Sequence, residues 1–316
     1  MSVPATGVQL RRDPNTPFGR WPRRGAPHGR RPCRALKERT RRNKRPNGLG
    51  APELRKPAEK QLNSARYDGG STVNPMIELE RHDAVFVLTM VDDENRWNTS
   101  FVREFAKALD EVEASEGAAA LVTMSAHDKF FSNGLDLEWI SSEGEHRGGD
   151  RKTFGAEFME LMGRIITLPM PTIAAVNGHA FGAGFMCAIG HDVRIMREDR
   201  GYLCANELQI GLTVPVPEIA LFRHKIPAPA FHETIILSKR WTAPAAVQAG
   251  FVESAVPLED LREAAMTRAT ELAPLAVHRK NFGWQKEAIY GENAALNTPH
   301  GAAHMLKNMS DFASAH

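Results

Sequence analysis

Cysteine is scarce in this 316-residue chain, which carries only Cys33, Cys187 and Cys204. An odd number of cysteines at unrelated spacings argues against a disulfide framework and fits a reducing compartment. No apolar stretch reaches the roughly 20 residues that a membrane helix needs. The first residues lack the apolar segment of a secretory signal, and the final Ser-Ala-His is not a peroxisomal tripeptide. We therefore expect a cytoplasmic protein that does not enter a membrane.

Metal-ligand spacing is also missing. The histidines, cysteines and carboxylates form no cluster with the spacing of a zinc site or of another metal site, so we expect no bound metal. What is present is ordinary for a globular protein, with 42% hydrophobic and 25% charged residues. Composition alone therefore does not select a function.

Acidic residues are rare in the first quarter of the chain. Residues 1–75 hold 18 lysines and arginines against 5 aspartates and glutamates, whereas the remainder holds 22 against 33. The net charge of +2 therefore conceals a basic segment joined to an acidic one. Residues 1–75 are also rich in arginine, proline and glycine, with almost no apolar periodicity, so we expect them to be disordered.

Three interpretations of residues 1–75 stay open. The basic run at residues 39–45 could bind phosphates, as an arm for nucleic acid or a membrane surface. The segment could instead be a transit peptide, although its prolines would disrupt an amphipathic helix. We favour a third interpretation, in which residues 1–75 do not belong to the mature protein, because Met76 stands where foldable sequence begins. A run of like charge alone rarely identifies a partner, so nucleic acid is not an expected one.

From Met76 onward, short apolar runs alternate with segments of helical periodicity. Strands are predicted at residues 77–82, 84–91, 118–125, 172–176, 192–196 and 252–256. Helices are predicted after the N-capping residues 98–100, over residues 153–168 and over residues 183–189. From Pro215 the chain is predicted to be mostly helical. Strands that alternate with helices indicate an α/β fold.

Two glycine-bearing turns each follow a predicted buried strand and precede a helix. They are Phe-Phe-Ser-Asn-Gly-Leu-Asp-Leu at residues 130–137 and Asn-Gly-His-Ala-Phe-Gly-Ala-Gly-Phe at residues 177–185. Small residues let backbone N–H groups face a ligand, and two converging N–H groups form an oxyanion hole. Glycine turns are common, however, and on spacing alone tight packing between elements explains both turns better.

The two turns are followed by the block Asn-Glu-Leu-Gln-Ile-Gly-Leu at residues 206–212. The order and separation of these three motifs are together highly specific. In this respect the chain resembles the enoyl-CoA hydratase/isomerase (crotonase) superfamily, from about Ile77 to its final helices. The resemblance implies a crotonase-like spiral of ββα units over residues 76–257 and a helical trimerisation region over residues 258–316. It also implies a homotrimer or hexamer with an acyl-CoA substrate. Coenzyme A is part of that substrate, so no separate cofactor is expected.

The resemblance also assigns roles by position. The oxyanion-hole N–H groups would come from Leu135 and Ala183, and Ser132, Asn133 and Gly134 of the first turn would contact the substrate. Two N–H donors and a helix dipole acidify the carbon next to a thioester, because they stabilise the enolate that forms when its proton leaves.

Cations are needed for the phosphates of coenzyme A. Lys129, just before the first turn, and Lys280, in the C-terminal helical region, are candidates by position. Basic residues of this kind are often merely solvated.

One glutamate is missing from the hydratase pattern. Hydratases of this superfamily use two glutamates, and the first would lie four residues after Gly182, where this chain has Met186. The second corresponds to Glu207, whose small and apolar neighbours favour a partly dry setting that raises its pKa. One carboxylate suits the shift of a double bond, because it can remove a proton from C2 of a 3-enoyl-CoA and return it at C4. The block around Glu207 also resembles the Δ3,Δ2-enoyl-CoA isomerases of fatty-acid degradation, with Glu207 as the catalytic residue.

Alternatives stay open. A hydratase, or another acyl-CoA reaction, could take a second carboxylate from Glu138 or Glu143, although a solvated position is the simpler explanation of both. The chain could also be a non-catalytic acyl-CoA-binding protein whose basic arm contacts RNA. We interpret Asp136 as a helix cap, Asp192 as structural and His179 as a packing residue.

Overall fold

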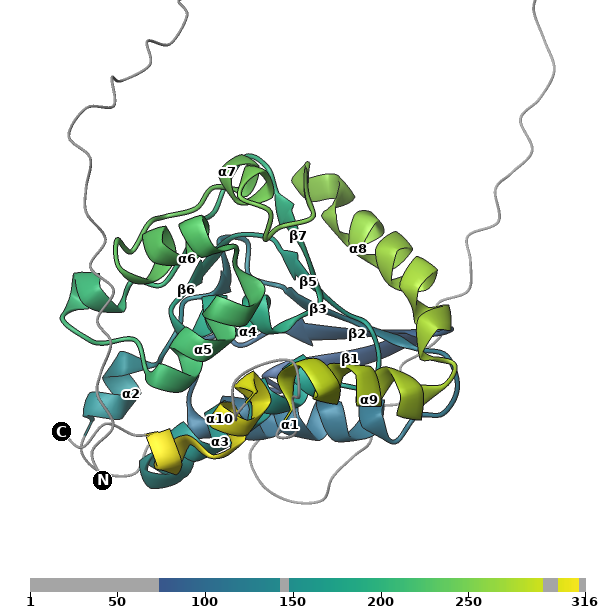
Figure 1. Ribbon diagram of the computed structural model, residues 1–316, viewed down its shortest axis with the longest axis horizontal. Helices are drawn as coiled ribbons and strands as arrows, with labels where there is room; N and C mark the ends of the chain where they lie inside the picture. The colour runs from purple at the N-terminus through teal and green to yellow at the C-terminus, as the bar shows by residue number, and fades with distance from the viewer. Residues whose placement is uncertain (1–73, 143–147, 292–300, 313–316) are drawn as a thin grey trace, which may run out of the picture. The chain divides into compact units, whose positions relative to one another are not determined.

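The computed structural model describes residues 74–142, 148–291 and 301–312 (Figure 1). The predicted basic segment at residues 1–75 lies outside these ranges except for its last two residues. Glu143, a candidate for a second carboxylate, lies outside them as well.

Six strands form the larger sheet, in the order β1-β2-β3-β5-β7-β9. They are β1 Ile77–His82, β2 Val85–Met90, β3 Ala120–Ser125, β5 Thr172–Val176, β7 Val193–Arg197 and β9 Ser254–Val256. The first pair is antiparallel, and every later pair is parallel. All six strands coincide with the predicted strands to within two residues.

Three very short strands form a second, parallel sheet in the order β4-β6-β8. They are β4 Phe130–Ser132, β6 His179–Phe181 and β8 Leu203–Cys204. The sequence predicted only turns in the first two of these places, because two or three residues are too few to show an alternating pattern. Each short strand follows a strand of the larger sheet and leads towards a helical segment. This repeat confirms the predicted α/β spiral of ββα units.

The helices of the spiral are α1 Thr99–Glu113, α2 Leu137–Ser141, α3 Arg151–Thr167, α4 Ala183–Gly190 and α5 Val216–Lys225. Further along lie α6 Ala228–Ile235, α7 Ala243–Gln248, α8 Leu258–Leu272, α9 Arg279–Tyr290 and α10 Ala302–Lys307. Three 3₁₀ turns, η1 Glu207–Ile210, η2 Ala273–Ala276 and η3 Met309–Phe312, connect or extend them. Asn98 caps α1 as predicted, since its side chain accepts a hydrogen bond from the backbone of Phe101.

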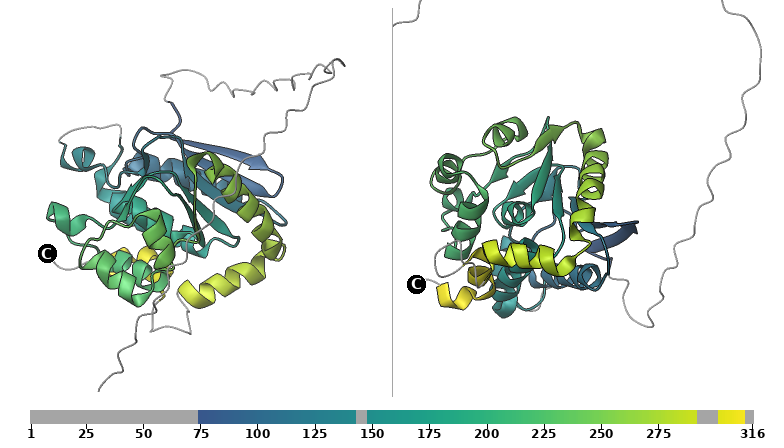
Figure 2. Two further views of the ribbon diagram at one scale, coloured as in Figure 1. Left: turned by 90° about the horizontal axis from the view of Figure 1, so that it is seen from above. Right: turned by 45° about the vertical axis from the view of Figure 1, so that its right-hand side comes forward.

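The larger sheet is covered on both faces, as parallel sheets usually are. Helix α8 lies along one face, where Leu261 and Ala265 pack with Val87, Val122 and Ile173 of the strands (Figures 1 and 2). The opposite face carries the main core, formed with helices α1, α3 and α4. Successive residues of one strand therefore enter two different cores.

The C-terminal helices return to this core. Helix α9 packs against α3, and α10 packs against α3 and α5. Lys286 of α9 is buried and lies 2.7 Å from the Asp192 carboxylate, which follows α4. A role of residues 258–316 in trimerisation stays a prediction. Within the described ranges, none of the helices has the length and hydropathy to span a membrane.

Candidate active site

The short sheet brings the two predicted turns into backbone contact. Ser132 of β4 is paired with Ala180 of β6. A Cβ on Gly134 would lie 2.7 Å from the carbonyl oxygen of Phe181, and a Cβ on Gly184 would lie 2.5 Å from that of Ser132. Side chains at these two glycines would therefore force the turns apart, so glycine is required at both positions.

A cavity of ≈ 170 Å³ lies between the turns. Its lining consists of Arg96, Asn133, Gly134, Leu135, Leu137, Phe181, Gly182, Ala183, Asn206, Glu207, Ile210 and Leu212. Five of the residues predicted from the sequence are therefore brought together: Asn133, Gly134, Leu135, Ala183 and Glu207. They come from three separate ββα units, which only the spiral places side by side.

Two backbone N–H groups of this lining have no hydrogen-bond partner among the described residues. Trp97 bonds the carbonyl of Gly134 and the N–H of Asp136, which leaves the N–H of Leu135 between them free. Ala183 is the first residue of α4, where N–H groups have no partner within the helix. These two groups have the chemistry of an oxyanion hole, and that role stays a prediction.

Glu207 lies at the start of η1, next to the second turn. A Cβ on Gly182 would lie 2.9 Å from Oε1 of Glu207, so this oxygen is close to the N-terminus of α4. The other oxygen, Oε2, is buried without a hydrogen-bond partner among the described residues. Burial raises the pKa of the Glu207 carboxyl. A carboxylate whose charge is poorly solvated is a stronger base than an exposed glutamate, as the sequence predicted.

Other predicted residues lie away from the cavity lining. Ser132 is buried behind it, and its hydroxyl donates a hydrogen bond to the carbonyl of Asn95. Lys129 and Lys280 are exposed, and neither is among the residues that line the cavity. Glu138 is exposed on α2 and does not line the cavity either. Contacts of the two lysines with coenzyme A stay predictions.

Met186 is fully buried within the main core, one turn into α4. Its backbone N–H bonds the carbonyl of Gly182, and its side chain does not line the cavity. The position that carries a glutamate in hydratases is thus occupied here by an apolar side chain without access to the site.

Arg96 lines the cavity, but the sequence analysis did not single it out. Its guanidinium donates to the Glu94 carboxylate at 2.6 Å, and the same carboxylate accepts the side-chain amide of Asn133 at 2.7 Å. Arg96 is also half exposed, so it places a positive charge at the rim of the cavity. The only available signal was a lone cation two residues before a helix cap, which is too common to indicate a function.

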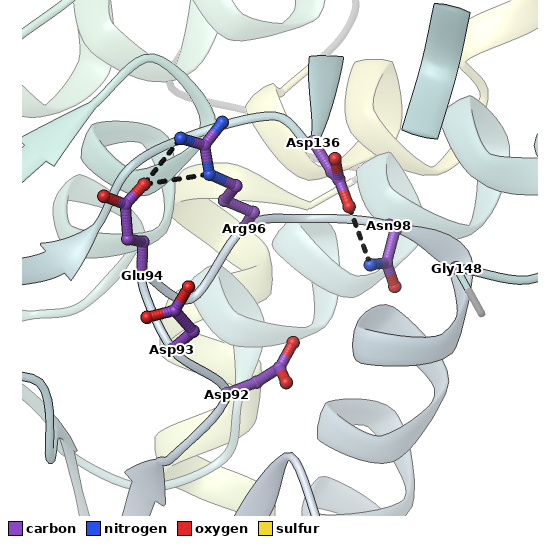
Figure 3. Close-up of a pocket in the computed structure, with 7 residues that line it drawn as sticks. All are labelled: Asp92, Asp93, Glu94, Arg96, Asn98, Asp136 and Gly148. Carbon is purple, nitrogen blue, oxygen red and sulfur yellow. Dashed lines mark hydrogen bonds and ion pairs between the residues drawn. The ribbon is translucent and has the colours of Figure 1, made fainter. Parts of the chain in front are cut away.

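Arg96 also lines a second hollow, of ≈ 230 Å³ (Figure 3). Its charged lining is mostly acidic, with Asp92, Asp93, Glu94 and Asp136 around the one arginine. Glu94 and Asp136 connect this lining to neighbouring elements. Glu94 binds Arg96, while Asp136 accepts from Asn98 and caps α2 as predicted, through the N–H of Trp139. This network holds the first turn against the start of α1. The negative charge of the second hollow makes it unsuitable for binding phosphates.

Glu218 is the other residue that the sequence analysis missed. It lies in the first turn of α5 and is only 4% exposed, and its Oε1 has no hydrogen-bond partner among the described residues. Burial, and then the charge of Glu207, raise the pKa of Glu218 well above its ordinary value. One pattern in the sequence could have indicated that Glu218 is buried. Leu221 and Phe222 follow it by three and four residues, so the three side chains share one face of the predicted helix.

Comparison with known proteins identifies the family. Residues 80–297 match the family described as enoyl-CoA hydratase/isomerase. Enoyl-CoA delta isomerase 3 of Arabidopsis thaliana is 32% identical over 221 residues, which cover 69% of this chain and 93% of that protein. The peroxisomal enoyl-CoA delta isomerase 2 of the same plant is 36% identical over 184 residues, covering 57% of this chain and 77% of that protein.

Solved structures agree on the fold. An enoyl-CoA isomerase of Mycobacterium tuberculosis superposes with a TM-score of 0.61 at 21% identity, covering 74% of this chain and 98% of that one. An enoyl-CoA hydratase/isomerase family protein of Pseudomonas syringae gives a TM-score of 0.58 at 25% identity, covering 67% and 94%. The family match spans more than half of the chain, the fold agrees with it, and the chain belongs to the enoyl-CoA hydratase/isomerase family.

Proposed function

We propose that this protein is a Δ3,Δ2-enoyl-CoA isomerase that moves a double bond by proton transfer through Glu207. One observation carries the proposal. Within the described part of the chain, Glu207 is the only carboxylate that lines the cavity containing the free N–H groups of Leu135 and Ala183. A site with one acid–base group suits a proton shift, whereas the addition of water in this family uses two carboxylates.

In the proposed reaction, the thioester oxygen of a 3-enoyl-CoA binds between the N–H groups of Leu135 and Ala183. Glu207 takes a proton from C2, and the electron pair of that C–H bond forms a dienolate whose negative oxygen faces the two donors. The same carboxyl group then returns the proton to C4. The double bond moves from C3–C4 to C2–C3, and Glu207 ends as the carboxylate with which it began.

The remaining lining fits an acyl-CoA. Leu137, Phe181, Ile210 and Leu212 form an apolar wall that suits an acyl chain. Arg96, at the rim, is a better placed cation for a phosphate of coenzyme A than Lys129 or Lys280, because it borders the cavity and they do not. A place in fatty-acid degradation, a homotrimeric or hexameric assembly and a cytoplasmic location belong to the same proposal. The relatives quoted above include an isomerase named as peroxisomal.

Incubation of the purified protein with a 3-enoyl-CoA and, separately, with a 2-enoyl-CoA tests the function. We expect isomerisation of the first and no hydration of the second. Glu207→Gln keeps the size of the side chain but cannot take a proton, so its kcat should fall by about 10²–10⁴-fold. Because Glu207 must be ionised to act and its pKa is raised, kcat/KM of the wild type should fall with decreasing pH before an ordinary glutamate would titrate.

Glu138→Gln is the matched control, since that residue is exposed and outside the cavity. It should behave as the wild type in both assays. Hydration of 2-enoyl-CoA without any isomerisation, or full isomerase activity of Glu207→Gln, would refute the proposal. Turnover of neither substrate would instead favour a non-catalytic acyl-CoA-binding protein.

A further inference from the structure

Two carboxyl groups of this chain, one on η1 and one on α5, each bury an oxygen atom. Oε2 of Glu207, which lies on the side of the carboxyl group away from Gly182, and Oε1 of Glu218 are both buried and lack a hydrogen-bond partner among the described residues. The charge of Glu207 acts directly on Glu218. A buried carboxyl oxygen without a partner is costly, and the cost is relieved when two carboxyl groups share one proton.

A structural role in capping α5 does not explain Glu218. A glutamate at the third position of a helix can accept a hydrogen bond from the N–H of the capping residue. The capping residue of α5 is Pro215, and Pro217 follows in the first turn, so neither offers an N–H group. Within the described residues, no cation forms a salt bridge with Glu218 either.

The elements packed against α5 supply no other partner. These are α4, α6, α10 and η3. The titratable side chains described on them are Cys187 of α4, His232 and Glu233 of α6, and His304 and Lys307 of α10. None of these acts on Glu218, and neither do Arg223, His224 and Lys225 of α5 itself. Lys225 is instead directed at Asp192. Glu207 is therefore the group to which Glu218 responds.

We propose that Glu218 is a positioning residue whose carboxyl group shares a proton with Oε2 of Glu207, directly or through one water molecule. This inference rests on the proposed function of Glu207 as the base. The shared proton would hold the Glu207 carboxylate in one orientation, with Oε1 towards the cavity and the N-terminus of α4. Glu218 itself does not line the cavity, so it acts only through Glu207.

Two substitutions distinguish the effect of losing the proton donor from the effect of changing the side-chain volume. Glu218→Gln keeps an N–H donor for Oε2, whereas Glu218→Met keeps the length of the side chain and removes the donor. We expect Glu218→Met to lower kcat about tenfold with little change in KM, because an unfixed base is badly aligned. It should remain folded, which a thermal melt checks, because a side chain of similar length fills the same space. Glu218→Gln should retain most of kcat.

The pH profile provides a second readout. When the pH rises through the pKa of Glu218, the donor is lost and two negative charges face each other, so kcat of the wild type should decline on the alkaline side. Glu218→Gln cannot ionise and should lack this decline. A purely structural role for Glu218 would leave the alkaline side of the profile the same in both proteins.

Infrared difference spectroscopy tests the proton without any turnover. The wild type should show the carbonyl stretching band of a protonated carboxylic acid at pH 7, and Glu218→Gln should lack it. In Glu207→Gln the neighbouring charge is gone, so the band should disappear at a lower pH than in the wild type. The absence of this band, or wild-type kcat and pH profile in Glu218→Met, would overturn the inference. The band is independent of substrate, so a failure of the isomerase assay alone would count against the proposed function only.

Discussion

At the scale of single residues, the site depends on how closely backbone and side chain approach at Gly182. Its φ of +47° lies in the region that favours glycine, and a Cβ there would be 2.9 Å from Oε1 of Glu207. The residue thus satisfies two requirements: it admits the turn that begins α4, and it leaves room for the proposed base. The sequence predicted the glycine turn and the glutamate separately. Their contact is a result of the fold.

Gly182→Ala should therefore lose activity beyond its cost in stability. The added methyl group must displace the Glu207 carboxylate, so we expect kcat for 3-enoyl-CoA to fall at least tenfold. A positive φ in a residue with a Cβ costs about 1–2 kcal/mol, which a thermal or denaturant melt would measure.

Gly250→Ala is the control for backbone strain alone. Gly250 has a φ of +83°, but a Cβ there would meet only Pro227 at 3.7 Å. It should lose a similar amount of stability and keep wild-type kcat. Equal kcat in the two variants would contradict the contact that we describe between Gly182 and Glu207.

The residues that sequence reasoning missed have a common physical origin. Arg96 is an ordinary charged residue in the sequence, and Glu218 is distinguished only by its register with Leu221 and Phe222, which is too weak a signal to single it out. Arg96 borders the cavity because the loop before α1 crosses the first turn, and Glu207 of η1 acts on Glu218 of α5 through its charge. Such neighbours arise from contacts distant in sequence, which local periodicity does not encode.

At the scale of elements, a buried ionic cluster joins the C-terminal helices to the spiral. Asp192 lies between β5 and β7, accepts hydrogen bonds from Thr172, and is close to Lys286 of α9 and Lys225 of α5. Burial by itself would raise the pKa of Asp192, but the charges of Lys286 and Lys225 outweigh it, so the pKa is lowered. The sequence analysis assigned Asp192 a structural role, and the contacts found here give that role a physical basis.

Asp192→Asn should destabilise the fold by about 3–5 kcal/mol at neutral pH, because it leaves buried Lys286 without a counter-charge. Since the folded-state pKa of Asp192 is lowered, its contribution is complete above the ordinary aspartate pKa of about 4 and is lost as the pH falls further. The difference in unfolding free energy between wild type and variant should therefore shrink below about pH 4 in denaturant titrations.

Lys225→Met serves as the comparison within the same cluster. Burial lowers the pKa of Lys225 to about 7, and its Nζ lies 3.9 Å from Asp192 compared with 2.7 Å for Lys286. Its removal should change stability by less than about 1 kcal/mol. If Lys225→Met proved as destabilising as Asp192→Asn, the cluster would not be organised around Lys286.

Secondary structure was predictable to the extent that elements are long. The six strands of the larger sheet and helices α1, α3 and α4 follow from apolar runs and periodicity. The strands β4, β6 and β8 did not, since each is stabilised by pairing within the short sheet and has no pattern of its own. These short strands are the ones that align the two turns.

At the scale of the whole molecule, the boundary near residue 75 is a testable division of the chain. Met76 is buried at 2% exposure, and its backbone N–H donates to the Glu104 carboxylate at 2.8 Å. The described core therefore includes Met76, the residue at which the sequence analysis placed the start of foldable sequence.

A protein that starts at Met76 should have the melting temperature and the kcat of the full chain, because the described core and cavity involve no residue before 76. If residues 1–75 act as a basic arm, binding of nucleic acid by the full chain should weaken as salt increases and be absent from the shortened protein. Loss of stability or of turnover in the shortened protein would show that residues 1–75 contribute to the folded enzyme.

The sequence by itself determined the fold class, the family resemblance and the position of Glu207, because these depend on local periodicity and on short motifs in a fixed order. Only the tertiary structure decided what surrounds Glu207. The parallel pairing of three very short strands joins two glycine turns, and the fold buries a second carboxyl group, that of Glu218, on which the charge of Glu207 acts. A glutamate becomes a candidate base through burial and neighbouring charge, and both are properties of the folded chain.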